Sequence, residues 1–153
     1  MLPAAVVSEF FSPSLEVNDH QLHIAQPGYI AKQGGTTQCG VLYHTEGADV
    51  WLGIIIWPEK ASTEQYPDPF YRNWPLPGVT PPQVLHEKTS SEGELLLLRT
   101  SMGYMAQVKT HRLQCNLSIL PRHGNMSVNT DRVWDWANRV FDRITRGVTE
   151  RRG

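Results

Sequence analysis

Cys39 is the residue with the clearest capacity for covalent chemistry, and it lies in the triplet Gln38–Gly40. A cysteine becomes a nucleophile when a nearby base or a helix N-terminus lowers the pKa of its thiol. Three histidines could supply such a base: His86, His111 and His123. The residues around Cys39 alternate as a strand does, and no helix begins after them. We therefore expect a small buried side chain at Cys39, and a cysteine-dependent enzyme is the alternative.

Metal and phosphate chemistry find little support in the sequence. His20 and His23 are three residues apart in a segment that looks extended, so their side chains point to opposite faces. Two cysteines, Cys39 and Cys115, are too few for a four-cysteine zinc site or a disulfide framework, and whether they pair with each other stays open. The chain has no HExxH, CxxC, GxGxxG or P-loop pattern. We expect no metal and no cofactor.

A stripe of arginine and tryptophan lies on a predicted C-terminal helix. Apolar residues recur there at helical spacing: Val133, Trp134, Ala137, Val140, Phe141 and Ile144. Asn129 or Thr130 can cap the start, and Gly147 predicts the end, which leaves residues 148–153 as a flexible tail. The adjoining stripe contains the residues expected to bind a partner: Arg132, Trp136, Arg139 and Arg143. Tryptophan and arginine are enriched at interface hot spots, although a solvated arginine face is the plainer interpretation.

Residues 58–82 form a second candidate surface. Seven of the eleven prolines lie there, so neither a long strand nor a long helix fits. The segment also holds the aromatic residues Tyr66, Phe70, Tyr71 and Trp74. Loops of this length are uncommon in small domains and are often functional. Because aromatic side chains tend to pack, we predict an ordered loop that folds over the sheet and contacts a partner.

The middle of the chain predicts antiparallel strands. Residues 37–44 and 50–57 flank a turn, residues 84–89 and 94–100 flank Ser90–Gly93, and residues 104–110 follow a turn at 101–103. In residues 112–120 the odd-numbered apolar residues share one face, while Gln114, Asn116 and Ser118 are expected to face solvent. The fold class is therefore α+β, with an antiparallel sheet of about five to seven strands. The C-terminal helix is expected to pack on that sheet.

Length and charge restrict the remaining classes. The 153 residues suit one domain over 1–153, and the longest apolar run, residues 50–57, is strand-sized rather than membrane-spanning. No signal peptide is evident at the start, which predicts a cytoplasmic protein, or a periplasmic or secreted one whose leader was removed. The formal net charge is −1, which disfavours nucleic-acid binding. Residues 1–98 carry −7 and residues 99–153 carry +6, so the halves neutralise each other or the basic end docks on an acidic partner.

The order of elements over about residues 22–146 resembles that of small PsbP-like sandwich proteins, which include bacterial chaperone-like adaptors. The resemblance consists of strand hairpins followed by a closing helix, without a shared motif, so it assigns no functional residue. It implies an α+β sandwich.

These observations favour a non-enzymatic protein-binding module, such as an adaptor, a secretion chaperone or an inhibitor of the immunity type. The partner is expected to be another protein, and the arginines suit an acidic one. Two alternatives remain: the Cys39 enzyme, including one with a small-molecule pocket beneath the loop, and a homo-oligomeric subunit that assembles through a sheet edge. Changing Trp74 or Phe70 to alanine is expected to weaken partner binding and leave the fold intact.

Overall fold

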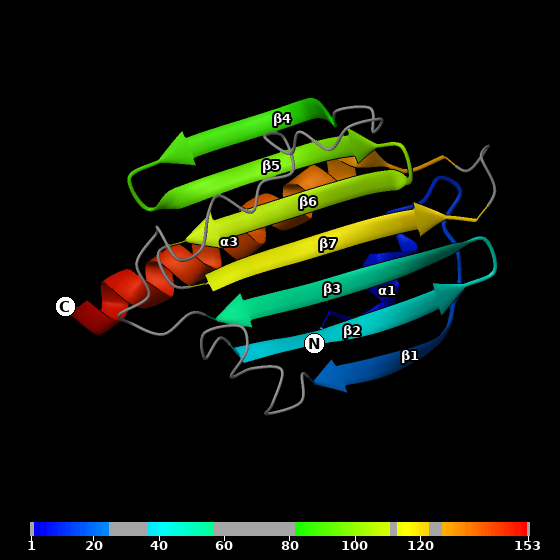
Figure 1. Cartoon of the computed structure of the whole chain (residues 1–153), viewed down its shortest axis with the longest axis horizontal. Helices are drawn as coiled ribbons and strands as arrows, with labels where there is room; N and C mark the ends of the chain where they lie inside the picture. Colours follow the sequence, from blue (N-terminus) through cyan, green and yellow to red (C-terminus); the bar gives the residue numbers. More distant parts are fainter. Residues whose placement is uncertain (1, 25–36, 57–81, 111–112, 123–126, 153) are drawn as a thin grey trace, which may run out of the picture.

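In the part of the chain that the structure describes, the protein forms a seven-stranded antiparallel sheet with two helices on one face (Figure 1). The structure is a computed structural model that describes residues 2–24, 37–56, 82–110, 113–122 and 127–152. This architecture confirms the predicted α+β class and the helix packed on the sheet.

Two meanders meet in the middle of the sheet. The strands are β1 (Val17–Ile24), β2 (Thr37–Thr45), β3 (Ala48–Ile56), β4 (Gln83–Ser90), β5 (Gly93–Thr100), β6 (Gly103–Thr110) and β7 (Leu113–Pro121). Their spatial order is β1-β2-β3-β7-β6-β5-β4, so the last strand of the second meander pairs with the last strand of the first. In that central pairing Leu52 lies opposite Leu117, although 65 positions separate them in the sequence.

Tight turns set the register of the second meander, as predicted. Thr100 pairs with Gly103, which leaves a two-residue turn between β5 and β6. The Thr100 hydroxyl accepts hydrogen bonds from the backbone N–H groups of Met102 and Gly103, at 3.2 and 3.1 Å. Gly103 has a φ of +154°, and a Cβ there would collide with the carbonyl oxygen of Ile119. Glycine is therefore the residue that this turn requires.

The helix-bearing face of the sheet forms the main core. The C-terminal helix α3 (Thr130–Arg152) packs on β6 and β5. Its buried residues Val133, Ala137 and Phe141 belong to the predicted apolar stripe. Below them lie the helix-facing side chains of the central strands: Leu95, Leu97, Ala106, Val108, Leu117 and Ile119. The apolar residues that recur every 3.6 residues on the helix thus pack against those that alternate every two residues on the strands, and together they form one core layer.

The other face of the sheet is also buried in part. Leu96 and Leu98 form a small apolar cluster there, so β5 is buried on both faces. Gln107 and Gln114 lie on the same face at 0% and 1% exposure. The expectation that Gln114 faces solvent is therefore wrong, because alternation assigns a side chain to a face without showing whether that face is covered. The Gln114 amide donates a hydrogen bond to Asn116, at 3.0 Å.

The N-terminal segment is part of the core, which the sequence did not predict. Helix α1 (Ala4–Ser8) leads into Phe10 and Phe11, which are 1% and 3% exposed. The Tyr43 hydroxyl donates a 2.7 Å hydrogen bond to the carbonyl oxygen of Leu2, and Phe11 forms a β-bridge with Val128. Residues 2–11 are thereby attached both to β2 and to the segment that leads into α3.

Helix α3 ends later than predicted. It continues past Gly147 to Arg152, where the sequence indicated an end and a flexible tail. One glycine inside a helix costs only about 0.5–1 kcal/mol, so it need not end a helix that the following residues favour. Among the described helices none is both long and apolar enough to span a membrane.

Candidate functional site

A groove of about 890 Å³ lies between α1, α3 and the sheet, on the face that is turned away from the viewer in Figure 1. Its floor consists of helix-facing side chains from β1, β2, β3 and β7: Leu22, Val41, Leu52, Ile54, Cys39 and Cys115. These strands lie beside the part of the sheet that α3 covers. The floor is almost entirely apolar, and Leu22 on the edge strand is 60% exposed.

Helix α3 supplies a basic wall. The arginines Arg132, Arg139, Arg143 and Arg146 line the groove together with Trp136 and Val140. At 3.6 residues per turn the four arginines fall within about 60° of the helix circumference, and Trp136 and Val140 lie between them and the core stripe. The wall therefore changes from apolar at its base to cationic at its rim. We call this cavity the arginine-rimmed groove.

The four helix residues that the sequence predicts to bind a partner all line this wall. Arg132, Trp136, Arg139 and Arg143 are brought together beside the floor of the groove. Trp136 is only 9% exposed, so it is part of the wall and not a projecting anchor. Sequence reasoning missed Arg146, although its spacing of three residues from Arg143 and seven from Arg139 was the signal for it.

The N-terminal segment also lines the groove. Leu2, Pro3 and Val6 line its far wall. The Phe10 ring meets the Trp136 ring edge to face, with a centroid separation of 6.0 Å and an interplanar angle of 72°. These residues were not recognised as site residues, because their role depends on docking across the sheet and not on a local pattern.

The charge of the rim is positive on balance. Four arginines line the groove against two carboxylates, Glu9 and Asp142. Glu9 is already engaged, since its Oε2 lies 3.7 Å from a guanidinium nitrogen of Arg132. Guanidinium groups remain protonated at all accessible pH values and present a planar fork of donors to carboxylates. The rim therefore favours an anionic occupant over a wide pH range.

The two cysteines lie on the floor of the groove and do not form a disulfide. Cys39 and Cys115 pair with Ile54 from opposite sides, so one strand separates them. Two strand spacings place their Cα atoms about 9.6 Å apart, beyond the roughly 7 Å that a disulfide spans. Burial, and then the nearby Cys39, raise the pKa of the Cys115 thiol to about 12. Cys115 is thus a protonated thiol at neutral pH.

His86 and His44 have neighbours of their own and do not lie beside the Cys39 thiol. His86 stacks on Trp134 at the β4 edge, with a centroid separation of 5.1 Å. His44 lies 2.9 Å from a carboxylate oxygen of Asp49. His111 and His123 lie outside the described residues. Within the described ranges no three metal-ligating side chains come together.

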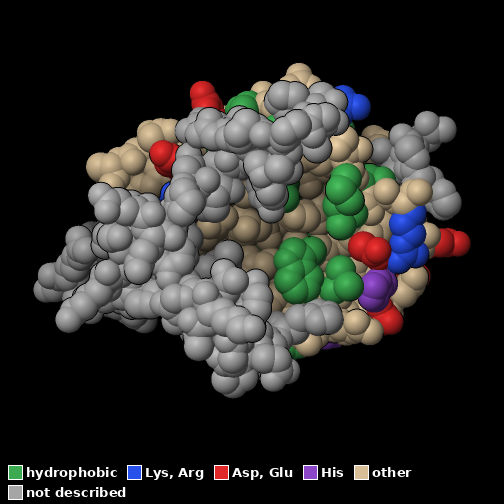
Figure 2. All heavy atoms as spheres, in the orientation of Figure 1, with side chains coloured by type: hydrophobic (Ala, Val, Ile, Leu, Met, Phe, Trp, Pro, Cys, Tyr) green, Lys and Arg blue, Asp and Glu red, His purple; other side chains and the backbone are tan. Residues whose placement is uncertain are grey.

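The opposite face of the sheet carries a separate charged cluster. Figure 2 shows acidic, basic and histidine side chains gathered beside apolar ones. There Arg122 and His44 both contact the carboxylate of Asp49, and His44 Nε2 lies 3.9 Å from Asp19. These charges satisfy one another, so the cluster is less suited to an external ligand than the groove is.

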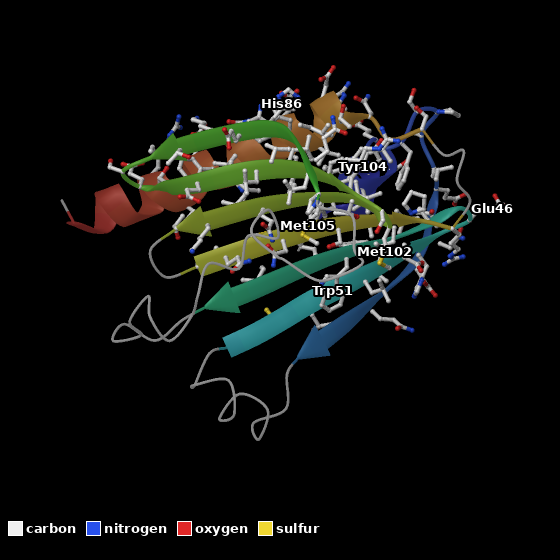
Figure 3. The ribbon with its side chains drawn as sticks, turned by 45° about the horizontal axis from the view of Figure 1, so that its top comes forward. Glu46, Trp51, His86, Met102, Tyr104 and Met105 are labelled. Atoms are coloured by element: carbon white, nitrogen blue, oxygen red, sulfur yellow. The ribbon has the colours of Figure 1, made fainter. Side chains whose placement is uncertain are left out.

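Next to that cluster the face is apolar but partly filled. Trp51 on β3 and Met105 on β6 lie there (Figure 3). The Trp51 ring lies across Gly40 and Gly53, so closely that a Cβ at either glycine would overlap the indole. The glycine pair is thus occupied by the protein's own side chain.

The predicted loop lies beyond what the structure describes. Tyr66, Phe70, Tyr71 and Trp74 all fall within residues 57–81, so their part in partner binding stays a prediction.

Comparison of the chain with protein-family models, with curated proteins and with solved structures finds no match. The resemblance to PsbP-like sandwich proteins therefore rests on the order of elements alone.

Proposed function

We propose that the protein is a non-enzymatic protein-binding module, of the adaptor, secretion chaperone or inhibitor type, which holds its partner in the arginine-rimmed groove. The observation that carries this proposal is the wall of α3. There Trp136 and Val140 lie next to the apolar floor, and the arginines lie above them at the rim. Burial of apolar surface supplies affinity, and the rim charges supply orientation and selectivity.

The chemistry of the lining favours binding over catalysis. Arginine side chains bind anions but do not exchange protons at ordinary pH. The raised pKa of Cys115 leaves it a poor nucleophile. The groups that remain are apolar side chains, a tryptophan, the half-buried thiol of Cys39 and two rim carboxylates. Apart from that thiol, they suit recognition of a shape and a charge.

The aromatic loop is the second part of this proposal. If Phe70 and Trp74 contact the same partner, alanine at either position weakens binding while the thermal unfolding midpoint stays within experimental error. Loss of folding without a separable loss of binding would make the loop a structural element instead.

An assembly subunit is the second candidate function. β1 is the last strand at one edge of the sheet, and Leu22 on that strand is 60% exposed. Pairing through this edge would give a molecular mass that rises with protein concentration in size-exclusion chromatography. A constant monomer mass would remove this candidate.

The proposed function is tested by affinity capture with matched variants. The bait proteins are the wild type, the groove variant Arg139→Glu/Arg143→Glu, and the control Arg99→Glu, which reverses an exposed arginine outside the groove. A partner protein captured stoichiometrically by the wild type and the control, and lost with the groove variant, is the expected result. Equal capture by all three baits, or none by the wild type, would reject the groove as the binding site.

A further inference from the structure

We propose that the occupant of the arginine-rimmed groove is an amphipathic α-helix of the partner protein, with acidic residues along the flank that faces α3. This inference rests on the proposed function and adds the conformation and the charge of the bound segment.

The helix layer of the fold has space for one more helix beside α3. Helix α3 packs on β6 and β5, while α1 has only five residues. Neighbouring helices pack with axes about 8–10 Å apart, and strands lie about 4.8 Å apart. A helix beside α3 therefore lies about two strands from β6, over β3. The apolar side chains of β3 at that place are Leu52 and Ile54, which form the floor of the groove.

The dimensions of the groove fit a helix that is partly sunk into it. The α3 residues that line the groove run from Arg132 to Arg146, a length of about 21 Å at 1.5 Å per residue, and Glu9 and Phe10 contact the first turns of that wall. A volume of about 890 Å³ over that length gives a mean cross-section of about 42 Å². A helix with side chains is about 10–12 Å across, so about two fifths to one half of its cross-section would enter the groove. The sunken half must be apolar and the outer half polar, which is the definition of an amphipathic helix.

The spacing of the arginines indicates where the acidic residues belong. Arg132, Arg139 and Arg146 are seven residues apart, and Arg143 lies four residues after Arg139. This is the heptad spacing by which charged flanks pair between neighbouring helices. Arg132 already lies 3.7 Å from Glu9, so a partner helix that lies along α3 meets Arg139, Arg143 and Arg146 with one flank. Carboxylates on that flank form charge-assisted hydrogen bonds. Lysines on the same flank would be repelled.

The test uses three synthetic peptides of about fifteen residues and the full-length protein. The first peptide carries a leucine seam flanked by glutamates, the second replaces the glutamates by lysines, and the third scrambles the first so that no amphipathic helix forms. Fluorescence anisotropy at low salt is expected to show binding of the first peptide, with the second and third at least tenfold weaker. The variant Arg139→Glu/Arg143→Glu is expected to reverse the preference between the first two, while Arg99→Glu leaves it unchanged. Circular dichroism of each variant confirms that it is folded.

Three results would overturn the inference. Equal affinity for the first and the scrambled peptide would show that charge alone is recognised, without a helix. The proposed function would still be supported if the capture experiment finds a partner that the wild type binds and the groove variant loses. Laurate that binds more tightly than the first peptide and displaces it would make the groove a site for a small anionic amphiphile. A dimer of this chain that the groove variant dissociates would make a second copy the occupant.

Discussion

Replacing Phe10 with alanine tests how the N-terminal segment supports the groove. Phe10 is 1% exposed and packs edge to face on Trp136. Truncation of a buried phenylalanine to alanine costs about 3–5 kcal/mol. Domains usually have about 5–15 kcal/mol of stability, so Phe10→Ala is expected to remain folded but with a much reduced margin.

The assay is urea denaturation followed by circular dichroism, with thermal unfolding as a second measure. For a chain of this size 1 kcal/mol corresponds to about 2–4 °C, so the midpoint is expected to fall by about 6–20 °C. Phe10→Leu keeps most of the apolar volume and should lose much less. Met102→Ala, at a side chain that is 70% exposed, is the neutral control.

A double-mutant cycle separates the ring contact from general burial. Combining Phe10→Leu with Trp136→Leu should give a coupling free energy of about 0.5–1.5 kcal/mol, the usual value for an aromatic pair. A loss below about 1 kcal/mol for Phe10→Ala, or zero coupling, would mean that the segment does not dock as described. The groove would then lack the part of its lining that the N-terminal segment supplies.

Three further predictions concern single sites. Cys115, whose pKa is raised to about 12, should resist thiol reagents at neutral pH in the native protein and react with them in urea. Fast labelling of Cys115 in the native protein would contradict its burial. A peptide bound in the groove should slow the labelling of the half-buried Cys39. Partial burial alone would raise the pKa of Asp49, but hydrogen bonds from Arg122 and His44 outweigh it and hold that pKa below 3.8. The resulting stability is fully present above pH 3.8 and lost at lower pH, so the cost of Arg122→Ala in urea titrations, about 0.2–1 kcal/mol, should vanish on acidification; a cost independent of pH would refute the pairing. Gly103→Ala should destabilise by more than 1 kcal/mol, because its Cβ meets the backbone, and a neutral effect by the same titration would show that the turn adapts.

Much of the secondary structure could be predicted because it follows from residues close together in the chain. The stripe from Val133 to Ile144 specifies an amphipathic helix by its spacing, and the same helical geometry aligns Arg132, Trp136, Arg139 and Arg143. The turns before Gly93 and Gly103 specify two hairpins. Each of these features depends on residues that are only a few positions apart in the sequence.

The groove itself was decided by contacts between residues far apart in the sequence. The pairing of β3 with β7 brings Cys39 and Cys115 to one floor, and the docking of Phe10 on Trp136 adds the N-terminal segment to the lining of the groove. The burial of Gln114 likewise depends on what covers a face and not on its strand. Local periodicity determines which face a side chain occupies, whereas strand order and the packing between elements determine which faces meet. The sequence alone thus determined the arginine stripe, and only the tertiary structure placed it above an apolar groove.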